Sequence, residues 1–226
     1  MSRIREFAFA AIALLSIAAT AGAGHLLDTG SGYQTGPLYV TVTGHNGDSS
    51  FYSTSGSIGL PPNYAALDGI AVPFMYCVDI FTDINVRGVY NADISTAGII
   101  NGASISNAGQ IAWLIDDVGF TATTPDQQEG LQAAIWQQVY GAAFSVDSVN
   151  TGAGIYSNYL ADIAALGSHT APVSDVLWIT PYDGNGAPLQ GQVVPAFGTQ
   201  IPEPSTIALL GLGVCCYGLR LRKQFA

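Results

Sequence analysis

Alternation of apolar and other side chains predicts β-strands near both ends of the chain. The segment GPLYVTVTG, residues 36–44, has an apolar residue at every second position, which is typical of a half-buried strand. The segment FMYCVDIF, residues 74–81, is a denser run of aromatic and β-branched residues, and it predicts a strand in the core. Two further apolar segments, 174–180 and 189–197, flank the turn-rich residues 181–188, so we expect a β-hairpin there.

The middle of the chain changes to helical spacing. Residues 106–120 carry apolar side chains three and four positions apart, with Ser106 in place to cap a helix. Residues 154–167 have the same kind of spacing. Between the first strands, residues 45–69 are rich in turn formers and predict a loop with one short strand.

The clearest helix start lies between these two helical segments. Thr124 is a good N-cap, Pro125 suits the first helical position, and Gln127 stands three residues after the cap. Along this helix an apolar stripe borders a second strip whose members follow one another every four residues. That strip consists of Gln132, Trp136 and Tyr140.

Strands first, helices in the middle and strands last predict an α+β domain. We expect a β-rich, sandwich-like or barrel-like subdomain with an inserted helical subdomain of about three helices. The expected domain covers residues 24–195. Both ends of the 226-residue chain lie outside it and have the composition of processing segments.

Residues 1–23 have the features of a secretory signal peptide. Arg3 and Arg5 precede an apolar run, and small residues at Ala21 and Ala23 form a cleavage site. The alternative is a retained membrane anchor, but the apolar run is shorter than the ~20 residues that span a bilayer. We therefore expect an exported chain.

The other end combines three features in order. Residues 196–204 form a spacer that ends in Pro202, Glu203 and Pro204, and residues 205–226 hold an apolar stretch and a basic tail. This arrangement resembles the PEP-CTERM sorting signal of Gram-negative bacteria. The resemblance implies cleavage by an exosortase and delivery to the cell surface or extracellular matrix, with membrane contact only through this segment. The alternative is a plain C-terminal anchor.

The part of the chain between these segments is strongly acidic. Residues 24–201 contain fourteen acidic residues and one basic residue, Arg87, and the single lysine of the chain, Lys223, lies in the basic tail. Such a surface repels phosphate groups, so we expect neither nucleic acid nor anionic lipid as a partner. The shortage of basic residues is also common in secreted bacterial proteins.

Cysteine counting leaves one thiol in the expected domain. Cys215 and Cys216 lie in the sorting segment, so Cys77 stands alone. An exported domain with a single cysteine can hold a buried inert thiol, an intermolecular disulfide or a reactive group. The count does not choose among the three.

Two short segments resemble the thioester domain of bacterial surface adhesins. They are YCVD at residues 76–79, on a predicted strand, and LQAAIW at 131–136, on the clearest helix; Leu131 stands where threonine is commoner. The resemblance implies an internal thioester between the Cys77 sulfur and the Gln132 side chain. It also implies a site environment formed by Tyr76, Asp79, Trp136 and Tyr140, in which the aromatic rings exclude water or simply pack in the core.

A thioester stores reactivity toward amines. The resemblance therefore implies adhesion by covalent capture of amine-bearing ligands, such as lysine side chains or polyamines. Each molecule reacts once, so the expected activity is binding rather than enzymatic turnover, with no cofactor and no metal. The absence of lysine from residues 24–201 would protect such a domain from reacting with its own copies.

Three other functions remain open from the sequence. One is a non-covalent structural or polysaccharide-associated matrix protein in which Cys77 is an inert core residue. Another is a cysteine enzyme using His25, His45 or His169, although none of these has a recognisable motif. The third is calcium binding at DGNG, residues 183–186, but the chain lacks the glutamate that completes an EF-hand.

Overall fold

A curled antiparallel sheet is the largest element of the structure. The computed structural model describes residues 24–30, 37–44, 49–53 and 65–196. Within these residues seven strands pair in the order β5-β4-β1-β7-β11-β12-β6. Their bounds are β1 His25–Asp28, β4 Ala66–Leu67, β5 Ile70–Ala71, β6 Tyr76–Cys77, β7 Val89–Ser95, β11 Val176–Tyr182 and β12 Gln192–Pro195. The predicted hairpin near the end is confirmed, since Val176 pairs with Pro195 and Ile179 with Gln192.

Two smaller sheets complete the β-structure of the described residues. One has the order β10-β2-β3, and the other is the hairpin β8-β9. Their bounds are β2 Leu38–Val42, β3 Ser49–Ser53, β8 Ile99–Ile100, β9 Ala103–Ser104 and β10 Phe144–Val146. The strand predicted in residues 36–44 is therefore confirmed as β2. The segment 45–69 contains β3 and also β4, where one strand is predicted.

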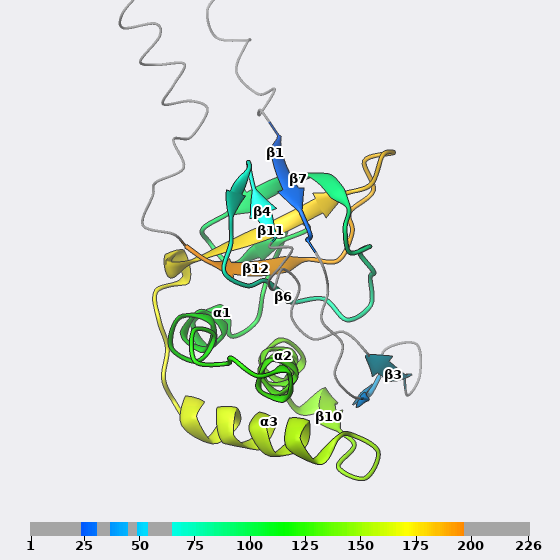
Figure 1. Ribbon diagram of the computed structural model, residues 1–226, viewed down its shortest axis with the longest axis vertical. Helices are drawn as coiled ribbons and strands as arrows, with labels where there is room; N and C mark the ends of the chain where they lie inside the picture. Colours follow the sequence, from blue (N-terminus) through cyan, green and yellow to red (C-terminus); the bar gives the residue numbers. More distant parts are fainter. Residues whose placement is uncertain (1–23, 31–36, 45–48, 54–64, 197–226) are drawn as a thin grey trace, which may run out of the picture. The chain divides into compact units, whose positions relative to one another are not determined.

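Among the described residues, three α-helices pack under the large sheet. They are α1 Ala108–Trp113, α2 Pro125–Tyr140 and α3 Ala153–Leu166; the π-helix η1 Leu114–Val118 extends α1, and the short 3-10 helices are η2 Gly141–Ala143 and η3 Val173–Asp175. Figure 1 shows α1 and α2 side by side between the sheet and α3. The predicted α+β class with three helices is confirmed. In the described part of the chain, no helix has both the length and the apolar character that a membrane span requires.

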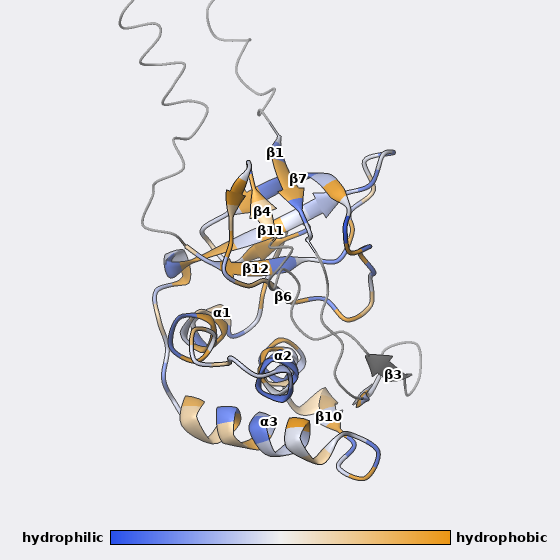
Figure 2. Cartoon of the chain, viewed as in Figure 1, coloured by the Kyte–Doolittle hydropathy of each residue, from blue (hydrophilic) through white to orange (hydrophobic). Residues whose placement is uncertain are grey.

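The start of α2 follows the sequence pattern. The Thr124 side chain accepts a hydrogen bond from the Gln127 backbone, and the Gln127 side chain accepts one from the Thr124 backbone, which is a complete capping box. Nine consecutive residues of α2, from Gln128 to Trp136, are buried. Because every face of this stretch is covered, α2 is the central helix. Helix α3, by contrast, lies on the side of the helices away from the large sheet, and Figure 2 shows both hydrophilic and hydrophobic residues along it.

The strand predicted at residues 74–81 is much shorter in the structure. Only Tyr76 and Cys77 pair, as β6 at the edge of the sheet. Beyond Val78 the backbone N–H groups bond to side chains, since that of Phe81 donates to Asp79 Oδ1 at 2.8 Å and that of Ile80 to the Tyr140 hydroxyl at 2.9 Å. The chain therefore turns away from the sheet after Val78, although Ile80 and Phe81 are apolar.

The N-cap predicted at Ser106 is also wrong. The cap residue of α1 is Asn107, which has a left-handed backbone at φ 52° and makes no side-chain capping bond. Its Nδ2 donates instead to the Gln138 carbonyl on α2 at 3.0 Å. The boundaries predicted for the signal peptide and for the sorting segment, including Pro202, Glu203 and Pro204, lie outside the described residues.

Candidate functional site

Cys77 lies on the edge strand β6, directly opposite Gln192 of β12. The next residue, Val78, donates its backbone N–H to the Gly191 carbonyl at 2.9 Å. Gly191 has no room for a side chain, because a Cβ there would collide with Ile100. The missing side chain lets the start of β12 lie close to Ile100 and Val78, and Cys77 itself is 8% exposed.

Gln132 reaches Cys77 from the helix. Its Oε1 accepts the Cys77 backbone N–H at 2.8 Å, and its Nε2 donates to the Cys77 carbonyl at 2.7 Å. Gln132 is 1% exposed. Both ends of the carboxamide are therefore fixed, and the N–H at Oε1 is placed to stabilise negative charge that develops on that oxygen during nucleophilic attack.

Two more glutamine side chains contact the sulfur itself. The thiol donates to Gln190 Oε1 at 3.1 Å, and Gln192 Nε2 donates to the sulfur at 3.5 Å. Gln192 Oε1 is buried and has no hydrogen-bond partner among the described residues. Sequence reasoning missed both glutamines. They could be found only by knowing that the LQGQVV segment pairs with the strand of Cys77. The spacing of residues within either segment does not show this pairing.

The surroundings keep the thiol protonated. Burial raises the pKa of Cys77 to about 12; the hydrogen bond from Gln192 lowers it, and the negative charges of Asp79 and Asp83 raise it further. Because the thiolate is the nucleophilic form, a free Cys77 reacts slowly with external reagents near neutral pH. An internal reaction can still occur, because an acyl group held close to the sulfur compensates for the small fraction of thiolate.

Asp79 shapes the loop that follows Cys77. Its carboxylate accepts hydrogen bonds from the Phe81 backbone at 2.8 Å, from the Thr82 hydroxyl, and from the Tyr140 hydroxyl at 3.4 Å. Burial is the main cause that raises the pKa of Tyr140, so this hydroxyl stays protonated and can donate. The Tyr140 ring also packs edge-on against Phe81 at 5.4 Å. Asp79 and Tyr140 therefore link the cysteine loop to α2.

Tyr76 and Trp136 supply the apolar side of the site. Tyr76 is 1% exposed and packs edge-on against Phe74 with ring centroids 5.7 Å apart. Trp136 stands one helical turn after Gln132, is 3% exposed and lies 6.5 Å from the Phe144 ring. Both rings are therefore packed in the core next to residues of the site, and a role in excluding water stays a prediction.

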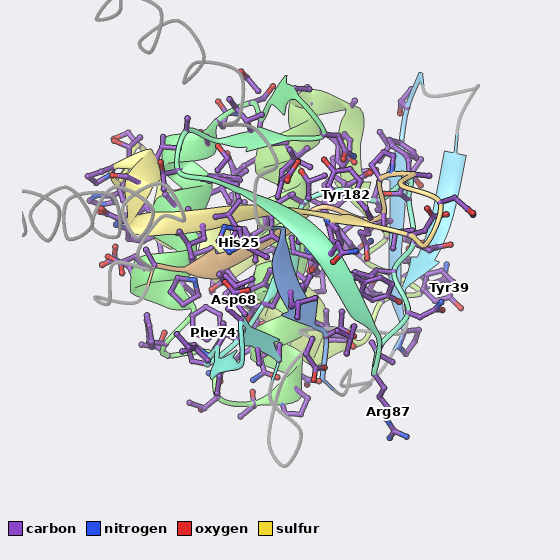
Figure 3. The ribbon with its side chains drawn as sticks, turned by 90° about the horizontal axis from the view of Figure 1, so that it is seen from above. His25, Tyr39, Asp68, Phe74, Arg87 and Tyr182 are labelled. Carbon is purple, nitrogen blue, oxygen red and sulfur yellow. The ribbon has the colours of Figure 1, made fainter. Side chains whose placement is uncertain are left out.

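The described histidines are engaged elsewhere. His25 Nδ1 lies 2.6 Å from Asp68 Oδ2, and the His169 ring stacks on Trp113 at 5.1 Å. Neither has a hydrogen bond with the Cys77 sulfur, and His45 lies outside the described residues. Figure 3 shows His25 beside Asp68 on the outer side of the sheet.

The positions of charged and metal-binding side chains narrow the kinds of site that the described residues can form. Figure 3 shows Arg87, the only basic residue between positions 24 and 201, pointing away from the fold. In the regions that the structure covers, no three His, Cys, Asp or Glu side chains are grouped to hold a metal ion. In the DGNG segment Asp183 Oδ1 accepts the backbone N–H groups of Asn185 and Ala187 at 2.9 and 2.8 Å, so this carboxylate caps its own turn.

Comparison with known proteins gives one sequence match and one structural similarity. The structure is similar to the N-terminal thioester domain of protein F2 like fibronectin-binding protein from Streptococcus pneumoniae, with 14% identity, a TM-score of 0.37, and coverage of 76% of this chain and 92% of that chain. A search of curated proteins finds no match. Residues 200–223 match the PEP-CTERM protein-sorting motif, so the predicted sorting signal is confirmed. The chain is an exported protein with a C-terminal signal for exosortase.

Proposed function

We propose that Cys77 and Gln132 form an internal thioester through which this surface or matrix protein covalently captures amine-bearing ligands. The observation that carries the proposal is the pair of hydrogen bonds, 2.8 and 2.7 Å long, between the Gln132 carboxamide and the Cys77 backbone. They hold the Gln132 carboxamide, in a buried site, against the backbone of the residue that carries the nucleophile, and positioning of this kind is what attack on an unreactive amide requires.

The bond forms by acyl transfer. The Cys77 sulfur attacks the Gln132 side-chain carbon, the C–N bond breaks, and ammonia leaves with the thiol proton. Negative charge that develops on Oε1 is stabilised by the Cys77 backbone N–H. Of the three carboxamides around Cys77, that of Gln132 has this donor on its carbonyl oxygen at 2.8 Å, whereas Gln190 Oε1 faces the thiol and Gln192 Oε1 has no described partner.

Capture is the second acyl transfer. A neutral amine on the ligand attacks the thioester carbon, an amide forms at Gln132, and the Cys77 sulfur leaves and regains a proton. The product is stable, so each molecule captures one ligand and the protein acts as a covalent binder without turnover. Lysine side chains and polyamines fit, because the acidic surface attracts cations and residues 24–201 lack a competing lysine.

Arg87 allows a direct test. Trypsin can cut residues 24–201 only after this exposed residue, which separates Cys77 from Gln132. We expect the two fragments of the exported chain to stay joined in acidic denaturant, with a combined mass one ammonia below the sequence value for the cut chain. Methylamine should release them and add its own mass, less ammonia, to the Gln132 fragment.

Variants assign the bond to its residues. Cys77→Ala and Gln132→Ala should abolish the joined species. Gln128→Ala is the matched control, because Gln128 is a buried glutamine one turn earlier on α2 whose Nε2 donates to the Ala122 carbonyl at 3.0 Å. If the joined fragments persist in Gln132→Ala but are absent from Gln190→Ala, the bond is formed by Gln190, and this would contradict the assignment.

The second candidate is a non-covalent structural or polysaccharide-associated matrix protein. The burial and raised pKa of Cys77 favour it, because they also describe an inert core thiol. In that case the fragments would separate in denaturant, and their masses would sum to the full value for the cut chain. The thiol would then titrate only after unfolding.

A further inference from the structure

Gln190 bridges the Cys77 sulfur and the loop that follows it. Its Oε1 accepts the thiol hydrogen at 3.1 Å, and its Nε2 donates to the Asp79 carbonyl at 2.7 Å. Its backbone N–H points to the Asp83 carbonyl at 3.4 Å. One side chain therefore joins the connection before β12, the sulfur and the loop after β6.

Gln190 is also the outermost of the three glutamines at the site. Gln132 and Gln192 are 1% and 0% exposed, whereas Gln190 is half-buried. Cys77 retains 8% of its surface. Because Gln132 and Gln192 approach from inside the fold, Gln190 covers the sulfur on the solvent side.

Gln190 makes both of its side-chain hydrogen bonds at once only while Cys77 is a protonated thiol. The carboxamide stands between one donor, the S–H group, and one acceptor, the Asp79 carbonyl. A sulfur that carries an acyl group has no hydrogen, so Oε1 then faces sulfur lone pairs. Turning the carboxamide over would place Nε2 at the sulfur but would set Oε1 against the Asp79 carbonyl. In either orientation the acylated state leaves Gln190 with one favourable contact fewer.

We propose that Gln190 is a latch that closes over Cys77 while the sulfur is a thiol and is loosened when the sulfur is acylated. The second half rests on the proposed thioester, and the first half does not. The latch would keep the reactive bond accessible to amines before capture. It would shield the released thiol afterwards, because the returning S–H restores the hydrogen bond.

Alkylation of the thiol tests the closed state. Methylamine treatment of the exported chain leaves Cys77 as a free thiol whether or not a thioester was present. We expect iodoacetamide to alkylate treated Gln190→Met and Gln190→Ala roughly 2- to 10-fold faster than treated wild type, the factor for one hydrogen bond. Met has the length of Gln without its hydrogen bonds. A wild-type rate in Gln190→Met would mean that bulk alone covers the sulfur and would overturn the latch.

Methylamine capture tests the loosened state. The rate at which methylamine releases the joined fragments should change less than twofold in the same variants, because the latch no longer holds an acylated sulfur. An equal acceleration of capture and alkylation would indicate general loosening and would overturn the proposal. Gln138→Ala, another half-buried glutamine but on α2 beside Asn107, should leave both rates unchanged.

The two proposals fail in distinguishable ways. If wild-type chain has the full sequence mass, the thioester and the loosened state are both refuted, and the alkylation experiment still decides whether Gln190 shields the thiol. If the thioester is present but the variants alkylate at the wild-type rate, the latch is wrong and the proposed function stands.

Discussion

The neighbouring helices α2 and α3 have 16 and 14 residues and pack together, yet they are built differently. Helix α2 begins with a complete capping box and buries nine consecutive residues. Helix α3 begins at Ala153, its N-cap residue Gly152 offers no side chain to cap it, and it buries Ile155, Tyr159 and Leu166. We infer that α2 is the element that positions the site through Gln132, and that α3 covers its outer face.

The contact between the helices depends on two glycines. A side chain at Gly130 of α2 would meet the backbone of Tyr159 and the Cβ of Asn158, both at 2.7 Å. A side chain at Gly154 of α3 would meet the end of the Asp126 carboxylate. The short distance between the two helices therefore depends on Gly130 of α2, which faces backbone. Gly154 of α3 faces only the Asp126 side chain, which can move.

Release of the proposed thioester should give the largest difference between the helices. By analogy with the loop-entropy model for disulfides, a bond across the 55 positions from Cys77 to Gln132 contributes roughly 4 kcal/mol to the free energy of unfolding. We expect methylamine to remove this stabilisation, measured by denaturation at mildly acidic pH where thioester hydrolysis is slow. Hydrogen exchange should accelerate more in α2 than in α3.

Cys77→Ala treated with methylamine is the control for this experiment, because it has no bond to release. Its stability should be the same before and after treatment. Equal loss of protection in both helices would contradict a special role for α2.

Substitution of the two glycines should give the next largest difference. Gly130→Ala forces the α3 backbone to move, at a cost of about 1–3 kcal/mol, against which alanine returns ~1 kcal/mol of helix propensity. Gly154→Ala should be close to neutral because the Asp126 side chain can rotate. Thermal unfolding of the pair measures the difference, and a larger loss in Gly154→Ala would reverse our view of which helix fixes the contact.

How far the sequence predicts this fold depends on how locally each element is specified. The start of α2 and the hairpin β11-β12 follow from neighbouring residues, and both are predicted. Strand β7 is not predicted, although Tyr90, Ala92 and Ile94 alternate with the exposed Val89, Asn91 and Asp93, because the pattern is weak: Ala92 is its one buried residue. Leu160, which helical spacing would place inward on α3, is 47% exposed, because the buried side follows Ile155, Tyr159 and Leu166.

The candidate site shows the same limit. Cys77 and Gln132 can be singled out because each stands in a recognisable segment, although their bond remains a prediction. Gln190 and Gln192 cannot, because they reach the sulfur only through the pairing of β12 with β6. The turn after Cys77 also depends on distant partners, since Tyr140 of α2 accepts the Ile80 N–H. Contacts of this kind are set by tertiary packing rather than by local pattern.

Changes at the helix starts should have opposite, moderate effects. Thr124→Ala removes the capping box of α2 and should cost about 1 kcal/mol. Gly152→Asp adds a carboxylate at the uncapped start of α3, where φ is −51°, and should gain a few tenths of a kcal/mol. Urea denaturation of both variants measures the contrast. A gain from Thr124→Ala would show that the capping box is not what holds the start of α2.

The smallest expected effect concerns a carboxyl group on α3. Burial raises the pKa of Asp162 to about 7, and its Oδ2 has no hydrogen-bond partner among the described residues. Because this pKa is higher in the folded than in the unfolded state, the contribution of Asp162 to stability is fully present below pH ~4 and is lost as the pH rises through about 7.

Replacing this carboxyl group tests the sign of that dependence. Asp162→Asn should match wild type at pH 4 and melt at a higher temperature at pH 8, by no more than a few degrees. Asp147 provides a control of opposite sign, since its hydrogen bonds with Asn150 and Val149 lower its pKa. The stabilising effect of Asp147 is therefore present above pH ~4 and is lost only as the pH falls further, through its lowered folded pKa, so Asp147→Asn should lower the melting temperature at pH 8 and still lower it at pH 4. If Asp162→Asn has no effect at either pH, α3 is open enough at this position to solvate the charge, which would extend its contrast with the enclosed α2.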